Sequence, residues 1–104
     1  MYAQNIIMKS AAIYIELLRQ FKKNRAFQYG IKQLVLFGSV ARGEEKEGSD
    51  VDICVELESP SLFNMVHIKE ELQNLLSTQV DIVRLRTTMN TVLRKRIENE
   101  GLNI

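Results

Sequence analysis

Three aspartates in this sequence occupy positions that suit a metal ion. Asp50 and Asp52 are separated by one residue, so on a strand their carboxylates project from the same face. Two like charges side by side raise the free energy unless a cation lies between them. Mg²⁺ is the predicted cation, because it prefers carboxylate oxygens and completes its shell with water and phosphates.

The third acid, Asp81, stands alone in the apolar run of residues 80–83. We expect it to be half-buried among its valine and isoleucine neighbours, where a carboxylate needs a partner. If this run pairs beside the strand of Asp50 and Asp52, Asp81 faces the same site. Two metal ions about 3.5–4 Å apart can then clamp the attacking and leaving oxygens of a phosphoryl displacement. In that arrangement Asp81 would help to deprotonate the acceptor hydroxyl.

A phosphate site is predicted at Gly38 and Ser39, directly after an apolar run. Gly38 allows close approach to the backbone, and Ser39 could cap a short helix whose N–H groups point at a phosphate. The Ser39 hydroxyl could bond a phosphate oxygen. Arg42 could neutralise a leaving pyrophosphate, or it could instead cap a helix or pair with Glu44 or Glu45, and these alternatives stay open.

Two other loop motifs are excluded by their residues. The glycine spacing of residues 38–43 matches a Walker A loop, but Glu44 and Glu45 stand where Lys and Ser or Thr are needed. The acidic pair opens like a calcium-binding EF-hand loop, but Cys54 and Val55 stand where a ligand and a glycine are required.

Helices and strands must position these residues, and their patterns predict an α+β fold, an α/β sandwich with helices packed on a small mixed sheet. Apolar residues three and four apart indicate the helices, and short apolar or alternating runs indicate the strands. Ser59 is the expected cap and Pro60 the first residue of the third helix. The expected elements are helices over residues 5–25, 40–42, 60–77 and 88–100, and strands over residues 31–37, 50–57 and 80–85.

Side chains outside these motifs have more ordinary interpretations. Cys54 shares the strand face of Asp52, and packing is favoured over metal binding because thiolates prefer softer metals. The basic run of residues 94–96 is typical of a solvated helix face, with nucleotide or RNA contact as the alternative. The residues expected to stripe the first helix are Ile7, Ala11, Ile15, Leu18 and Phe21, and those expected to face inward on the last are Met89, Val92, Leu93 and Ile97.

Length and composition limit the class of protein. The 104 residues predict one domain, with an amino-terminal helix in residues 1–28 and a catalytic core in residues 29–104. A net charge of +1 argues against broad nucleic-acid binding. No apolar stretch is long enough to span a membrane and no signal peptide is recognisable, so a cytoplasmic protein is expected. A domain this small could gain stability from a homo-oligomer or hetero-oligomer.

The ordered set of motifs resembles that of the polymerase β-like nucleotidyltransferase superfamily, in particular its smallest branch, the minimal nucleotidyltransferase (MNT) proteins. Family members use two aspartates as metal ligands and a third as ligand and base, which implies these catalytic roles for Asp50, Asp52 and Asp81. The resemblance extends from about residue 29 to the carboxyl end. The residues that carry it most clearly are Phe37-Gly38-Ser39, Ala41-Arg42-Gly43, Ser49-Asp50 and Asp52.

The resemblance also implies a function. Many MNT proteins are antitoxins paired with a helical HEPN ribonuclease toxin, and some transfer AMP from ATP to a tyrosine hydroxyl of that toxin. We therefore expect a Mg²⁺-dependent protein adenylyltransferase that uses ATP and acts on a HEPN partner. Two alternatives remain, an antitoxin that acts by complex formation alone and an enzyme that modifies a small molecule. Because larger relatives add domains that hold the acceptor, a second protein is expected to do so here.

Overall fold

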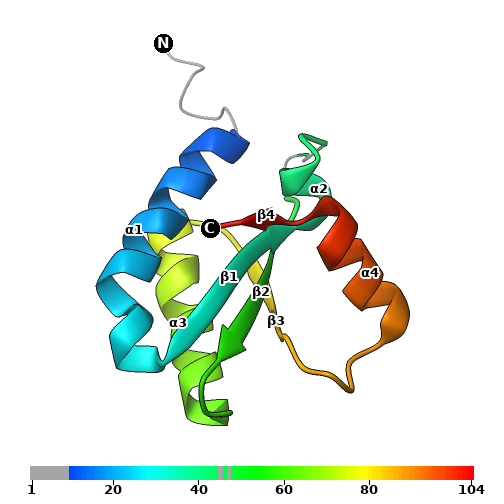
Figure 1. Ribbon diagram of the computed structural model, residues 1–104. Coiled ribbons are helices and arrows are strands. Elements are labelled where there is room, and N and C mark those ends of the chain that lie inside the picture. The colour runs from blue at the N-terminus through cyan, green and yellow to red at the C-terminus, as the bar shows by residue number, and fades with distance from the viewer. Residues whose placement is uncertain (1–9, 45, 47) are drawn as a thin grey trace.

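A four-stranded mixed sheet lies at the centre of the computed structural model, which describes residues 10–44, 46 and 48–104 (Figure 1). The strand order is β3-β2-β1-β4. The antiparallel neighbours of β1 (Ile31–Phe37) are β2 (Val51–Leu57) and the short β4 (Leu102–Asn103). The parallel neighbour of β2 is β3 (Val80–Arg84). The mixed sheet and its helices confirm the predicted α+β class.

Helices cover both faces of this sheet. The longer helices, α1 (Ala11–Tyr29) and α3 (Leu62–Leu76), lie on one face, and α4 (Thr91–Glu100) lies on the other (Figure 1). The helix α2 (Gly38–Ala41) is a single turn at the end of β1. None of the helices described here is long and apolar enough to cross a membrane.

The sheet buries alternate residues on opposite faces, as strand geometry requires. On the face covered by α1 and α3, Leu36 and Ile53 pack in the larger core with Leu18 and Leu72. The opposite face forms a smaller core under α4. Its buried members are Val35, Phe37, Cys54 and Ile97. Since Asp52 is opposite Phe37 in the β1–β2 register, it lies on the α4 face of the sheet.

The predicted stripe of α1 is confirmed where the structure describes it. Leu18 and Phe21 are buried, and Ala11 and Ile15 pack against the same core. The expected start over residues 5–9, including Ile7, lies outside the described residues. The helix continues four residues beyond the expected end, and Gly30 then ends it with a positive φ of 67°.

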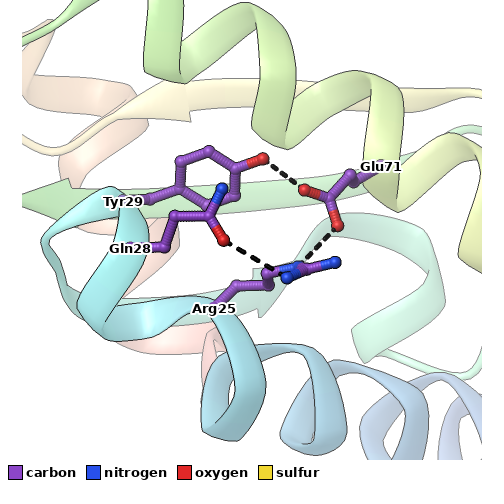
Figure 2. A network of polar contacts seen from close by, with 4 residues as sticks. All are labelled: Arg25, Gln28, Tyr29 and Glu71. Atoms are coloured by element: carbon purple, nitrogen blue, oxygen red, sulfur yellow. Dashed lines mark hydrogen bonds and ion pairs between the residues drawn. The ribbon is translucent and has the colours of Figure 1, made fainter.

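A polar network fixes the end of α1 to α3 (Figure 2). The Tyr29 hydroxyl donates to Oε1 of Glu71, and Nε of Arg25 donates to Oε2 of the same carboxylate at 3.0 Å. Arg25 also donates to Oε1 of Gln28 at 3.2 Å. Because Glu71 accepts from both Tyr29 and Arg25, its pKa is lowered, and the Tyr29 bond is the largest cause.

Three expectations about the helices and strands are wrong. The third helix is capped by Ser61 rather than Ser59, because the Ser61 hydroxyl accepts from the Asn64 N–H at 3.2 Å. The last helix begins at Thr91 rather than residue 88, after Asn90 accepts from the Leu93 N–H at 3.0 Å. Val92, expected inward, is 68% exposed. The edge strand β4 was not predicted, since two residues carry no readable alternation.

Candidate active site

The parallel pairing of β2 and β3 places two of the three predicted acids side by side. Asp52 and Asp81 are partners in the strand register. At the start of β2 the Val51 N–H donates to the Gln79 carbonyl at 3.0 Å, which holds this end of the register in place. Asp50 directly precedes β2. The condition set by the sequence, that the strand of Asp81 lie beside that of Asp52, is met.

The three acids differ in their exposure to solvent. Asp52 is half-buried, whereas Asp50 and Asp81 are exposed. The expectation of a half-buried Asp81 is wrong, because β3 is an edge strand and its outer side has no neighbouring strand. The pKa of Asp52 is raised, first by burial and then by the charges of Asp81 and Asp50, while Arg96 and Arg42 oppose the rise. The charges of the two other acids and of the two arginines therefore all act on Asp52.

The donor set of this site suits a hard divalent cation, although the carboxylates are not gathered around one point. In the part of the chain that the structure describes, no three His, Cys, Asp or Glu side chains are arranged to hold a metal ion. A cation would relieve the repulsion that raises the pKa of Asp52. Exposed side chains such as those of Asp50 and Asp81 change rotamer within nanoseconds, so they can turn towards an arriving ion.

Gly38 lies against the carboxylate of Asp52. A Cβ atom at Gly38 would be 2.1 Å from Oδ2 of Asp52, and the φ of Gly38 is 77°. Both facts require glycine, since a side chain would collide with the acid and strain the backbone. The structure thus shows Asp52 in close contact with Gly38, which brings the end of β1 next to the acids. The approach of a phosphate to Gly38 stays a prediction.

Ser39 lies in the first turn of α2, next to Gly38. The prediction that Ser39 caps this helix is wrong, because α2 begins at Gly38 and Phe37 occupies the cap position with no side-chain hydrogen bond. The Ser39 side chain is half-exposed, and its hydroxyl makes no hydrogen bond within the described residues. The hydroxyl is thus available to a ligand, and its contact with phosphate stays a prediction.

Arg42 follows α2 and is bound by two acids. Its Nε lies 2.9 Å from Oε1 of Glu44, and its Nη1 lies 2.7 Å from Oε1 of Glu100 in α4. Of the open alternatives, the structure shows pairing with Glu44 and adds Glu100. It also shows capping, because Arg42 is the C-cap residue of α2. The other suggested partner, Glu45, lies outside the described residues. Arg42 in this arrangement links α2 to α4.

Arg96 is a residue near the acids that the sequence did not single out. It is exposed on α4, and its positive charge lowers the pKa of Asp52. The basic run of residues 94–96 was the available signal, but sequence alone did not show which of its members lies near the acids.

The packing role predicted for Cys54 is confirmed. Its thiol is buried, and burial raises its pKa to about 11, so it stays protonated at neutral pH.

Comparisons with known proteins agree with this geometry. The model of a family described as a nucleotidyltransferase domain matches residues 18–104. The protein adenylyltransferase MntA of Thermococcus cleftensis is 36% identical over 85 residues, which cover 81% of this chain and 85% of the relative.

Two solved structures share the fold. A minimal nucleotidyltransferase has a TM-score of 0.76 and 29% identity, covering 92% of this chain and 97% of its own. A mutant of the toxin–antitoxin complex MntA–HpeT has a TM-score of 0.64 and 26% identity, covering 93% of this chain and 72% of the matched chain. These matches span most of the described sheet and helices.

Proposed function

The chain belongs to the nucleotidyltransferase domain family, in its minimal branch, and we propose that it transfers AMP from Mg²⁺-bound ATP to a tyrosine hydroxyl of a HEPN toxin. The transfer would silence the toxin, so the enzyme would act as its antitoxin. The name of the relative MntA, protein adenylyltransferase, supports ATP as the donor and a protein as the acceptor. The toxin–antitoxin complex among the similar structures supports the kind of partner.

One observation carries the proposal, the register of Asp52 with Asp81 next to Gly38. This register puts two carboxylates on one sheet face, and Gly38, which is in close contact with Asp52, is followed directly by Ser39. Carboxylates that can hold metal ions are what metal-assisted nucleotidyl transfer requires.

Each residue has a proposed role in the reaction. Asp50, Asp52 and Asp81 would hold Mg²⁺, with two ions expected, and the metal would supply positive charge to the triphosphate. Ser39 would donate a hydrogen bond to a phosphate oxygen, beside Gly38. Asp81, exposed at the sheet edge, can be reached by a hydroxyl from a second protein.

The proposed transfer breaks one bond and forms one. The acceptor oxygen attacks the α-phosphorus of ATP, its proton passes to the carboxylate of Asp81, and the bond from the α-phosphorus to the bridging oxygen breaks. Pyrophosphate leaves, and the acceptor gains one AMP group.

The test is transfer of label to the toxin. The chain is incubated with a HEPN toxin encoded beside it, MgCl₂ and ATP labelled at the α-phosphate, and the toxin is then analysed by mass spectrometry. We expect the toxin to gain the mass of AMP on a tyrosine. The double variant Asp50→Ala/Asp52→Ala should not label it, whereas the control Glu70→Ala, an exposed acid on α3, should label it normally.

Neutralisation of the toxin by the double variant separates this proposal from the binding alternative. If that variant still blocks the toxin at equal stoichiometry and no AMP is found on wild-type-treated toxin, the chain acts by complex formation. Labelling that persists in the double variant would refute the roles given to Asp50 and Asp52.

A further inference from the structure

The two arginines near the acids differ in their availability to a ligand. Arg42 donates to Glu44 at 2.9 Å and to Glu100 at 2.7 Å, so its charge is already compensated. Arg96 forms no ion pair within the described part of the chain. An arginine that forms no ion pair and lies beside a predicted phosphate site is a candidate for binding that phosphate.

The packing of α4 determines the direction in which Arg96 projects. Ile97 is buried against the sheet in the smaller core, and Glu100 reaches Arg42 beyond the end of α2. Residues four apart lie on the same side of a helix, so Arg96 lies one turn before Glu100 on the side that faces α2. Arg94 is two residues away, on the opposite side, and its guanidinium lies 3.6 Å from Glu98.

The register of the sheet places Asp52 at the same end of the molecule. Asp52 is opposite Phe37, the residue that directly precedes α2, and it lies on the sheet face that α4 covers. A nucleotide whose Mg²⁺ is held by Asp52 would therefore bring its phosphates towards α2 and the side of α4 that carries Arg96.

We propose that Arg96 binds the triphosphate of the nucleotide, while Arg42 braces α2 against α4 through Glu100. The inference rests on the proposed function, since it assigns a phosphate contact within that site. A guanidinium presents paired N–H donors that match phosphate oxygens. Because Arg96 forms no ion pair within the described residues, it breaks none when it binds phosphate. The proposal assigns this contact to the β- and γ-phosphates, so Arg96 should discriminate between ATP and AMP.

The experiment measures the affinity of the whole chain for ATP, ADP and AMP with MgCl₂, by calorimetry, in matched variants. Arg96→Gln should weaken ATP binding about ten- to a hundredfold and leave AMP binding nearly unchanged. Arg96→Lys should retain part of the preference for ATP, because it keeps the charge without the paired donors. The control Arg94→Gln removes an equal charge from the other side of the helix and should bind like the wild type.

The outcomes separate this inference from the proposed function. Equal ATP affinities in Arg96→Gln and Arg94→Gln, with a wild type that binds ATP, would overturn the role of Arg96 alone. An equal loss of ATP and AMP binding in Arg96→Gln would also overturn it, by indicating a general structural effect. A wild type that binds no nucleotide at all would refute the proposed function together with the inference.

Discussion

The backbone of Gly38 and the carboxylate of Asp52 are in direct contact, so that a Cβ atom at residue 38 would be 2.1 Å from Oδ2. This contact joins the end of β1 to the acid at the centre of the site. It also explains why a glycine with a φ of 77° is required at this point.

The variant Gly38→Ala is therefore expected to lose transferase activity and to lower the free energy of unfolding by about 1–3 kcal/mol, from backbone strain and the displaced Asp52. The control is Gly43→Ala, whose φ of 72° imposes a similar strain but whose Cβ would meet nothing within 4 Å. Denaturant unfolding and AMP transfer are measured for both. Equal effects of the two substitutions on activity would show that the contact with Asp52 is unimportant.

Replacement of Asp52 should separate stability from activity. In the folded protein, burial and the charges of Asp81 and Asp50 disfavour the ionised form of Asp52. Asp52→Asn removes that repulsion, so we expect the melting temperature at pH 7 to rise, by an amount equivalent to less than about 1 kcal/mol for a half-exposed group. Transferase activity should fall at least about a hundredfold. A variant that is both less stable and fully active would contradict the assignment.

Mg²⁺ should stabilise the wild-type protein even without nucleotide. An ion that binds only the folded state raises the free energy of unfolding by about 1.4 kcal/mol at ten times its dissociation constant. We expect the melting temperature to rise with MgCl₂, and to rise much less in Asp52→Asn and Asp81→Asn. Glu70→Asn, another exposed acid outside the site, serves as the control for non-specific binding. An increase that is the same in all four proteins would indicate that these carboxylates hold no metal.

Much of the site follows from the sequence because strand patterns act over short distances. The apolar run of β1 and the alternation around Asp52 and Cys54 are local features, and both strands form as predicted. The parallel pairing of Asp52 with Asp81 depended on strand order, which the sequence could state only as a condition.

Features set by the packing of distant segments could not be predicted in this way. The exposure of Asp81 depends on β3 lying at the edge of the sheet. The pairing of Arg42 with Glu100 joins residues far apart in the chain, as does the proximity of Arg96 to Asp52. The choice between Ser59 and Ser61 as the helix cap was decided by which hydroxyl reaches a free N–H, and two serines around one proline give the same local signal.

The proposed brace between Arg42 and Glu100 can be measured by a double-mutant cycle. The free energies of unfolding of the single variants Arg42→Gln and Glu100→Gln and of the double variant should not be additive, because the two side chains form an ion pair. The pair of Arg94 and Glu98, which is longer at 3.6 Å and more exposed, is the control and should couple less. Absence of coupling for Arg42 and Glu100 would leave Arg42 free to bind a ligand.

The network of Tyr29 predicts how stability changes at alkaline pH (Figure 2). Burial, followed by the hydrogen bond to Glu71 and its charge, raises the pKa of Tyr29 from 10.0 to about 12. The folded protein therefore binds more protons at this group than the unfolded chain does between these values. It follows that the stabilising contribution of Tyr29 is complete below pH 10 and is lost as the pH rises towards 12.

The variant Tyr29→Phe should be less stable than the wild type at pH 8, because Glu71 loses the hydrogen bond that the Tyr29 hydroxyl donates. Its free energy of unfolding should also fall less steeply between pH 10 and 12, so that the difference between the two proteins narrows there. Denaturant unfolding at half-unit steps of pH measures this difference. If the wild type and Tyr29→Phe show parallel curves over this range, the hydroxyl of Tyr29 titrates alike in the folded and unfolded chains.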